Sequence, residues 1–513
     1  MPGAVRRVFA LYFFLLPAIC AADEISELRE KIAAQQQQLN EQRQLLDAQQ
    51  KALDEQRKML DRLASAAPAP SPAQPTPAAT PVALVHNVAS VEKPAASPLA
   101  FRIGGAEFAP GGFMDFATVW RSTNVGTGIV TSFGAIPFSN TAAGRLSETR
   151  SSAQNSRLTL TMTSSPFKNT TVTGYVETDF WGSQPSNGYV TSNSNTLRMR
   201  QFWVDVRRDK WEVLGGQGWT LLTPNRVGVS TMPADLFIGL GADSNYLVGL
   251  VWGRSGQLRL TYHPDKKWAM AVSLESPEQY VTSATTLPQC ANTQVGNGSA
   301  TTTPNVRPDV VAKVAYDTTV ANRALHFELA GLSRQFETSP APNVHMTAQG
   351  IGGSFNTVAE VAKNFRLILT TFYSSGGGRY VVGLGPDLVV GPDGSISPVH
   401  SMSGIAGFEY RPTAKSQFYG YYGADYFRRN FIVTSPGNYL GFGYPGSSTS
   451  ANRQIQEPTF GYIRTYYRSP NFGALQIVTQ YSWLTRAPWS VPAGTPTTAH
   501  AHLVFASLRY TLP

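Results

Sequence analysis

Hydrophobic and polar residues alternate with a period of two through residues 257–275. The first arm places Leu258, Leu260 and Tyr262 on one face of an extended chain, and Arg259 and Thr261 on the other. After a polar turn at 263–266 the alternation resumes. A period of two indicates strands and not helices, so this segment predicts a β-hairpin.

The same pattern recurs from Phe101 onward and predicts sixteen strands. They lie near 111–122, 154–164, 170–182, 196–207, 210–217, 247–263, 267–275, 308–317, 323–334, 345–358, 364–374, 403–411, 415–427, 458–468, 472–485 and 500–512. An even number of strands allows antiparallel closure. The predicted fold is therefore all-β, a 16-stranded antiparallel transmembrane β-barrel over residues 101–513.

The connections between these strands alternate in length. Short ones fall at 165–167, 208–209, 264–266, 318–322, 359–363, 412–414 and 470–471. Most of the others, at 123–153, 183–195, 218–246, 276–307, 335–344, 375–402, 428–457 and 486–499, are long. Outer-membrane barrels carry short turns at one end and long loops at the other, whereas a soluble sandwich has no reason to sort its connections in this way.

Alternation also predicts the direction of the side chains. The outer face receives Leu158, Leu160, Met162, Val172, Val176, Phe180, Val310, Val314, Tyr316, Leu325, Phe327 and Leu329. The inner face receives Arg157, Glu177, Asp179, Arg259, Lys313, His326, Glu328 and Arg509. An apolar outside and a polar inside are what a transmembrane barrel requires. A dry interior built from the same apolar residues would exclude transport.

Three more arginines share a strand face with apolar residues, so alternation leaves their direction open. Arg198 and Arg200 lie on the face of Phe202, and Arg464 lies on the face of Phe460. An arginine facing lipid near mid-membrane costs roughly 2–4 kcal/mol, which favours the lumen. The candidate pore-lining residues are Arg157, Arg198, Arg200, Arg226, Arg259, Lys313, Arg464 and Arg509. The alternative for each is a wall residue paired with a neighbouring acid.

Arg226 belongs to a long segment, 218–245, that is predicted to fold into the lumen. It also contains Asp235, Asp243 and two turn glycines, Gly239 and Gly241. A pore selects by the charge that lines its narrowest part, so this segment opposite wall arginines would orient anionic or dipolar solutes. The alternatives are that it covers the mouth or contacts another subunit.

Residues 1–100 have a different organisation. Residues 1–22 combine Arg6 and Arg7 with an apolar run and small residues, which predicts a secretory signal peptide. Lipidation at Cys20 is disfavoured by the bulky Ile19 before it. Residues 64–100, with eight prolines by residue 98, predict an extended Pro/Ala-rich linker.

Residues 23–63 carry a seven-residue repeat. One seam position holds Ile25, Ile32, Leu39, Leu46, Leu53 and Leu60, and the other holds Leu28, Gln35, Gln42, Gln49, Gln56 and Leu63. This pattern predicts an α-helical coiled coil about 58 Å long. The alternatives are a solitary charged helix or a Gln-rich tract without structure. The seam leaves the number of chains open, although three would suit a trimeric barrel.

Charge and composition narrow the function. The signal segment adds +2 and residues 23–63 carry −2, so the net +9 of the chain belongs to residues 101–513. In a barrel, such an excess can point into the lumen and attract anions; we expect no nucleic-acid partner. No internal stretch approaches the ~20 apolar residues of a membrane-spanning helix.

The sequence offers little catalytic or metal chemistry. It contains no G-x-S-x-G, H-E-x-x-H or phosphate-loop motif. His500 and His502 share a strand face but lack a third ligand, and Cys290 is most simply an unpaired thiol. We therefore expect no enzyme, no cofactor and no metal. A plugged lumen or a clustered Ser/His/acid set would instead favour a surface enzyme or an adhesin.

The order of signal peptide, Gln-rich coiled coil, Pro/Ala linker and sixteen strands resembles the DcaP-like trimeric porins of Gram-negative outer membranes. The segments Leu197–Val204 (LRMRQFWV) and Val213–Trp219 (VLGGQGW) are similar to the fourth and fifth strands of that family. The resemblance implies a homotrimer with one pore per subunit for small anionic solutes such as dicarboxylates. Phosphate-selective porins are the second resemblance. The chain departs from the pattern in ending Tyr510-Thr511-Leu512-Pro513, so either Tyr510 acts as the assembly signal or insertion uses another.

These expectations combine into a passive, water-filled channel in the cell outer membrane, in contact with its lipid. It would prefer anions, and its coiled coil would lie in the periplasm, where the expected contacts are the cell wall or a periplasmic partner.

Overall fold

The computed structural model describes residues 97–182, 195–236, 241–281, 307–382 and 385–513. The predicted signal peptide, the coiled coil, most of the linker, Cys20 and Cys290 lie outside these residues. The chain divides into two units, Met1–Val82 and Ala83–Pro513, and every described residue belongs to the second unit.

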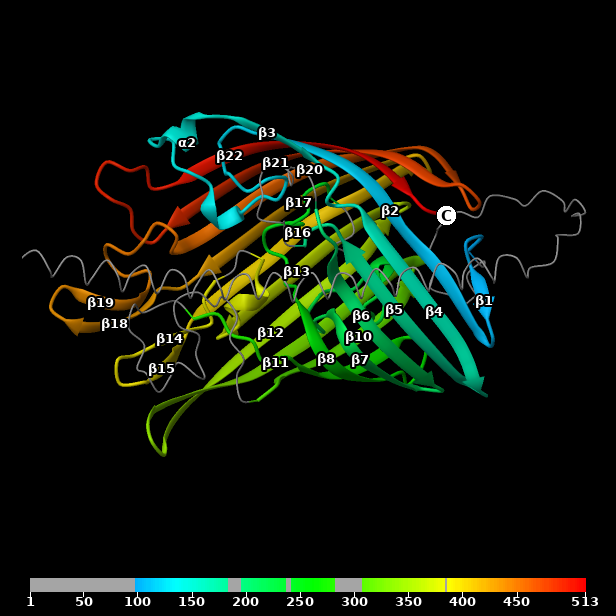
Figure 1. Ribbon diagram of the computed structural model, residues 1–513, viewed down its shortest axis with the longest axis horizontal. Helices are drawn as coiled ribbons and strands as arrows, with labels where there is room; N and C mark the ends of the chain where they lie inside the picture. The colour runs from blue at the N-terminus through cyan, green and yellow to red at the C-terminus, as the bar shows by residue number, and fades with distance from the viewer. Residues whose placement is uncertain (1–96, 183–194, 237–240, 282–306, 383–384) are drawn as a thin grey trace, which may run out of the picture. The chain divides into compact units, whose positions relative to one another are not determined.

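Eighteen strands form one sheet. β1 (Phe101–Ile103) and β3 (Glu148–Ser152) pair with β2 alone, and the remaining sixteen close a ring because β2 pairs with both β4 and β22. All pairings in the ring are antiparallel (Figure 1). The ring strands are β2 (Ala106–Arg121), β4 (Arg157–Phe167), β5 (Thr170–Asp179), β6 (Arg198–Arg208), β7 (Trp211–Trp219), β8 (Arg254–Tyr262), β9 (Trp268–Glu275), β10 (Asp309–Val320), β11 (Arg323–Ala341), β12 (Val344–Ala362), β13 (Phe365–Ser375), β16 (His400–Thr413), β17 (Ser416–Phe427), β20 (Asn452–Ser469), β21 (Gly473–Pro488) and β22 (Ala499–Thr511). The predicted 16-stranded antiparallel barrel is confirmed.

Several of the predicted boundaries are wrong. β2 and β20 begin at Ala106 and Asn452, before the predicted 111 and 458. β8 begins at Arg254 and not at residue 247, because residues 247–253 lie in the lumen and are apolar for that reason. Residues 335–344 are not a loop: β11 and β12 continue as a hairpin to the pair Ala341 and Val344.

The connections are sorted between the two ends of the barrel. Left-handed residues such as Asn169 (φ 60°), Asp209 (φ 52°) and Asn364 (φ 61°) make the tight turns at one end, here called the turn end. The opposite loop end carries α2 (Ala142–Arg145), the hairpins β14 (Leu388–Val390) with β15 (Ile396–Pro398) and β18 (Asn430–Ser435) with β19 (Asn438–Phe442), and the 3-10 turns η1 (Phe133–Ala135) and η5 (Gly378–Tyr380) (Figure 1).

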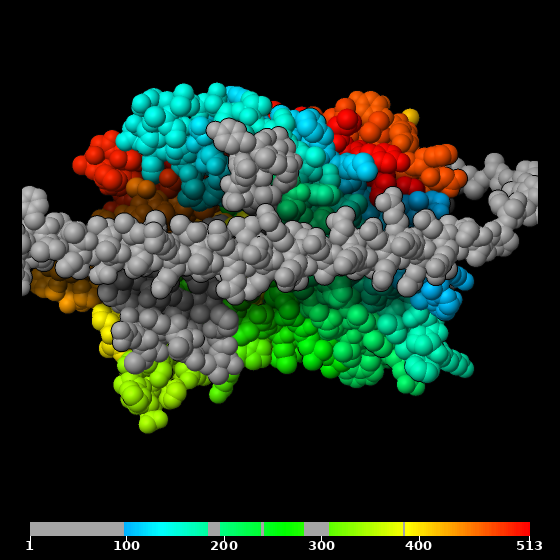
Figure 2. Space-filling model, in the orientation of Figure 1, coloured from blue at the N-terminus to red at the C-terminus, as the bar shows by residue number. Residues whose placement is uncertain are grey.

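The barrel has its apolar side chains outside. Leu258 is 56% exposed and Val272 48%, whereas Arg259 and Lys313 on the opposite face are 3% and 1% exposed. Figure 2 shows this outer surface for the strands drawn in green. Aromatic pairs such as Trp211–Tyr262, with ring centroids 4.6 Å apart, lie on it near the turn end, as in the aromatic girdles of membrane barrels. The predicted inversion is thus confirmed.

Among the described residues, no helix has the length and apolar character needed to span a membrane.

Candidate functional site

The loop between β7 and β8, described at residues 220–236 and 241–253, folds into the lumen and is here called the inner loop; inward folding was predicted for residues 218–245. It includes the 3-10 turn η2 (Pro233–Asp235). Its backbone N–H groups donate to wall acceptors on three distant strands. These bonds are Asn225 N to Glu328 at 3.1 Å, Ala242 N to Gln480 at 2.9 Å and Val248 N to Glu457 at 3.0 Å. The inner loop therefore crosses the barrel from β11 to β20 and β21.

Glycines let the inner loop lie directly on the wall. A Cβ added to Gly423 of β17 would stand 1.8 Å from the Val248 carbonyl oxygen, and one added to Gly249 would stand 2.1 Å from that of Gly404. Real Cβ atoms do not approach this closely, so both contacts require glycine.

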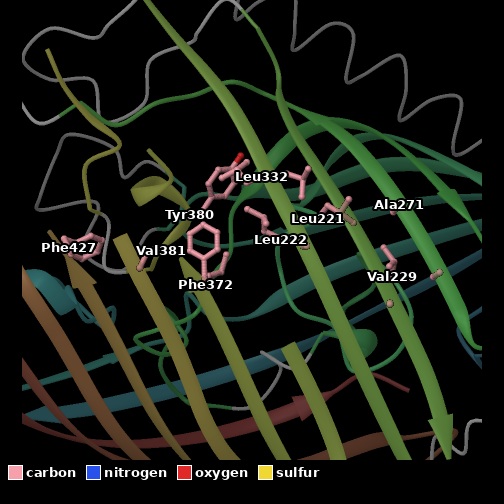
Figure 3. Close-up of a cluster of buried hydrophobic side chains, with 14 of the residues drawn as sticks. Leu221, Leu222, Val229, Ala271, Leu332, Phe372, Tyr380, Val381 and Phe427 are labelled. Carbon is pink, nitrogen blue, oxygen red and sulfur yellow. The ribbon is translucent and has the colours of Figure 1, made fainter. Parts of the chain in front are cut away.

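Apolar packing fills part of the lumen. Leu221, Leu222 and Val229 of the inner loop pack with Ala271, Leu332 and Phe372 of the wall and with Tyr380 and Val381 of the segment 376–399 (Figure 3). A third segment, 122–147, covers the inner wall through a cluster that includes Ile129, Phe133 and Ile136. The lumen is therefore narrower than the hollow centre expected from alternation.

Partly exposed inner side chains mark the part of the lumen that these segments leave accessible to water. They follow β2, β4 and β21 and include Glu107, Ala109, Thr159, Thr161, Thr163 and Gln476. By contrast, Lys313, His326 and Glu328 on the inner faces of β10 and β11 are at most 2% exposed. These partly exposed side chains lie on one side of the barrel, along β2 and β4, and the space beside them is here called the accessible path.

Five guanidinium groups gather beside this path and are here called the lumen arginine cluster: Arg157, Arg198, Arg254 and Arg509, which are partly exposed, and Arg200, which is buried behind them. Three acids lie among them. Arg198 donates two hydrogen bonds to Asp179, at 2.9 and 2.7 Å. Arg200 forms ion pairs with both Asp179 and Glu177. Arg509 pairs with Asp115 at 2.9 Å. Arg157 stands 3.6 Å from Glu177. The cluster keeps an excess of positive charge.

A β-bulge decides the direction of Arg198 and Arg200. The register between β5 and β6 shifts between Glu177 and Thr178, so β6 carries one extra residue at this point. Phe202 and Val204, on the turn-end side of the bulge, face outward, whereas Arg200, the extra residue of the bulge, is only 3% exposed and faces the lumen. A bulge reverses the alternation of faces, which a strict period of two does not reveal.

Aromatic side chains of the inner loop and β7 face the lumen arginine cluster. Trp219, Tyr246 and Trp252 contact each other with ring centroids 5.1–6.0 Å apart. Arg200 donates to the Tyr246 hydroxyl at 2.6 Å, and Arg200 and Arg254 stand 5.7 and 5.8 Å from the Trp219 ring centroid. Stacking on these rings holds the guanidinium groups in place without neutralising them.

Arg226, at the far side of the inner loop, does not join that cluster. It donates to both carboxylate oxygens of Glu409 on β16, at 2.9 and 2.7 Å. Arg366, which pairs with Glu409 in the β13–β16 register, and Arg411 lie close by. This group forms a second basic site toward the turn end.

The remaining three candidates have other surroundings. Arg259 donates to the Trp219 carbonyl at 2.8 Å, and Lys313 donates to the Thr223 carbonyl at 2.8 Å and pairs with Glu328 at 3.1 Å, so both fasten the inner loop to the wall. Arg464 lies on the outer face beside Tyr462 and donates to Ser416 Oγ at 3.0 Å. The inward prediction for Arg464 is thus wrong: near the turn end its side chain reaches polar groups without entering the lumen.

Burial and neighbouring charge set the titration of three inner-loop groups. Burial raises the pKa of Asp243 to about 6. Burial would also raise the pKa of Tyr246, but Arg200 and Arg157 outweigh it and the pKa falls. For Arg226, burial lowers the pKa and Glu409 more than offsets this, so it stays charged.

Alternation gave no hint of Arg254 or of the ring of Trp219, because both stand where β7 and β8 meet the inner loop. Their one sequence signal was the abundance of aromatic residues near the inner loop. His500 and His502 face outward and stack on Trp483, with ring centroids 6.0 and 6.3 Å apart. Within the described ranges, no group of three or more His, Cys, Asp or Glu is placed to hold a metal ion.

Comparison with known proteins places the fold. The outer membrane channel DcaP of Acinetobacter baumannii matches over 79% of this chain and 97% of its own, with a TM-score of 0.59 and 17% identity. An anion-selective porin from Comamonas acidovorans matches over 79% and 99%, with a TM-score of 0.45 and 11% identity. OmpT, an outer membrane protein of Vibrio cholerae, matches over 80% of this chain and 99% of its own, with a TM-score of 0.43 and 9% identity. No protein-family model and no curated protein matches the sequence. The chain thus has the fold of the DcaP channel, as the sequence resemblance predicted.

Proposed function

We propose that this protein is a passive outer-membrane porin that prefers small anionic solutes. The observation that carries the proposal is the lumen arginine cluster, held beside the accessible path by the inner loop and the β6 bulge. A solute carboxylate crossing this zone exchanges part of its hydration for guanidinium groups. The acids between the arginines keep that attraction weak enough for release.

Small dicarboxylates are the solutes that fit this arrangement best. Arg254 has no acidic partner among the described residues, and Arg198 keeps 37% of its side chain exposed despite its bond to Asp179. Two cationic groups along one path match two carboxylates on one solute. A phosphate-type selectivity is the alternative, since guanidinium groups bind phosphate equally well.

We further infer a homotrimer in outer-membrane lipid, with the predicted coiled coil of residues 23–63 in the periplasm and in contact with the cell wall or a periplasmic partner. The turn end would face the periplasm and the loop end the exterior. The apolar outer wall supports the lipid contact, and the DcaP fold and the predicted coil support the location and assembly.

Planar-bilayer recording tests the proposal. Under a KCl gradient the reversal potential should take the sign of anion preference, and succinate should lower the KCl current more than an uncharged solute of equal size. A cation preference, or bilayers without conductance, would contradict it.

A further inference from the structure

One part of the outer wall departs from the apolar pattern of the rest. On the loop-end half of β17, β20, β21 and β22 a groove of about 280 Å³ opens outward, here called the outer groove. Its lining includes Tyr422, Gln454, Gln456, Trp483, Thr485 and His500. The amides of Gln454 and Gln456 have no hydrogen-bond partner within the described residues. Amides left without partners in hydrocarbon are costly, so the outer groove fits a ligand with polar groups.

Unpaired cations stand at the loop-end margin of the outer groove. Arg429 and Arg453 lie 5.5 and 5.8 Å from the centroid of the same Trp489 ring. The indole N–H of Trp489 donates to the Phe427 carbonyl at 2.9 Å, which fixes the ring. Both arginines are exposed, and no acid pairs with either in the part of the chain that the structure describes. We call Arg429, Arg453 and Trp489 the outer arginine rim.

The outer arginine rim and the outer groove are continuous along the wall. Gln454 follows Arg453 directly and pairs with Tyr426, whose ring meets Trp489 at 6.2 Å. Toward the turn end, the same face presents Phe460 at 58% exposure. From the loop end inward the wall is therefore cationic, then amide and aromatic, then apolar.

We propose that the rim and groove bind a phosphate-bearing glycolipid from the surrounding leaflet. Arg429 and Arg453 hold the phosphate, Gln454, Gln456 and His500 contact headgroup hydroxyls, and the acyl chains follow Tyr422 and Phe460. Guanidinium groups are the usual protein partners of phosphate. A second copy of the chain related by a two-fold axis fits less well, because such an axis brings the same arginines of both copies together. The inference rests on the proposed membrane location and extends it to one lipid class.

The site is tested by measuring how much bis-phosphorylated lipid A binds to the purified full chain in detergent. Native mass spectrometry measures the bound lipid. The variant R429Q/R453Q should weaken binding by at least about tenfold, since two charge-assisted contacts are lost. Lipid A stripped of its phosphates should bind the native chain as weakly as it binds the variant. R464Q is the matched control, because Arg464 is an outward arginine on the same strand at the opposite end, and it should bind as the native chain does.

Four results would overturn the proposal: undiminished binding by the folded double variant, equal loss in R464Q, full displacement of lipid by millimolar inorganic phosphate, or cross-links joining two chains at Gln456. Circular dichroism and heat-modifiable mobility establish that each variant is folded. Conductance of the same samples separates this inference from the porin function. Conductance without binding of lipid A refutes the lipid site alone. Binding of lipid A without conductance refutes the channel alone.

Discussion

Arg226 and Glu409 lie 183 positions apart in the sequence, yet the guanidinium of one donates to both carboxylate oxygens of the other, at 2.9 and 2.7 Å. This ion pair connects the inner loop, which lies inside the lumen, to β16 of the barrel wall. Since the side chains keep only 17% and 6% of their surface exposed, the pair is poorly screened, and its loss leaves a charge without compensation.

Removing the carboxylate should loosen the inner loop. We expect E409Q to lower the free energy of unfolding by roughly 3 kcal/mol, the low end for a broken buried pair, and to add open-channel noise. Chemical unfolding in detergent and single-channel recording measure the two effects. R226Q/E409Q should lose less than E409Q. E360Q, at the exposed Arg323–Glu360 contact of 3.7 Å, should cost under about 1 kcal/mol; equal losses in E360Q and E409Q would refute the special role of this pair.

The inverted barrel predicts opposite outcomes at adjacent residues of β4. L160R places a cation against lipid and should cost about 2–4 kcal/mol, with reduced insertion into membranes. T161R turns the same side chain toward the accessible path, where water solvates it, and should insert normally. Membrane fractionation with heat-modifiable mobility compares them. Equal insertion of both variants would contradict the assignment of the two faces.

Close contact between the inner loop and β17 predicts a strong effect at Gly423. G423A would drive a methyl group to within 1.8 Å of the Val248 carbonyl oxygen, so the inner loop must shift, at a cost of about 1–3 kcal/mol. The single-channel conductance should change when the inner loop shifts. G331A is the control, because a Cβ at Gly331 meets no atom within 4 Å. Native conductance in G423A would show that the contact does not position the inner loop.

Arg254 should contribute more to anion preference than its neighbours. Its charge is not neutralised by an acid in the described residues, so R254Q removes a full positive charge from the path. We expect the reversal potential under a KCl gradient to move toward zero, with little loss of stability. R464Q removes the same charge from the outer face and should leave the reversal potential unchanged. A shift of equal size in both variants would point to net charge and not to the lumen.

Asp243 should make the inner loop sensitive to pH. Its pKa is raised from an ordinary value of 3.8 to about 6, so the folded chain binds this proton more tightly than the unfolded chain. Stability therefore falls as pH rises from about 4 to about 6 and then levels off, by at most roughly 3 kcal/mol. D243N should flatten this part of the profile of unfolding free energy against pH. An unchanged slope in D243N would refute the assignment.

The wall could be predicted from sequence because each strand has to satisfy lipid on one face and water on the other. That constraint is local and repeats every second residue, so the sixteen strands and the outward direction of Leu258 could be predicted. The prediction from alternation fails where the constraint is relaxed. The bulge in β6 left the direction of Arg200 undecided, and the position of Arg464 near the turn end gave it polar contacts on the outer face.

The lumen was less predictable, because its contacts join residues far apart in the chain. Lys313 was predicted on the correct face of its strand. The residues near it in the sequence did not show that its ammonium group would donate to the Thr223 carbonyl. Residues 247–253 were assigned to a strand since inner-loop packing also selects apolar residues. The bond between Arg200 and Tyr246 depends on where the inner loop crosses the barrel, and no period in the sequence encodes that path.

Closure of the ring between β2 and β22 has a consequence for biogenesis. β2 is the first and β22 the last of the sixteen ring strands along the chain, so the seam cannot close until nearly all of the polypeptide is present. Until then two long edges display unsatisfied amides and invite aggregation. Pairing of β2 with β22 removes both edges at once, so closure of this seam ends the exposure of the whole barrel wall to aggregation.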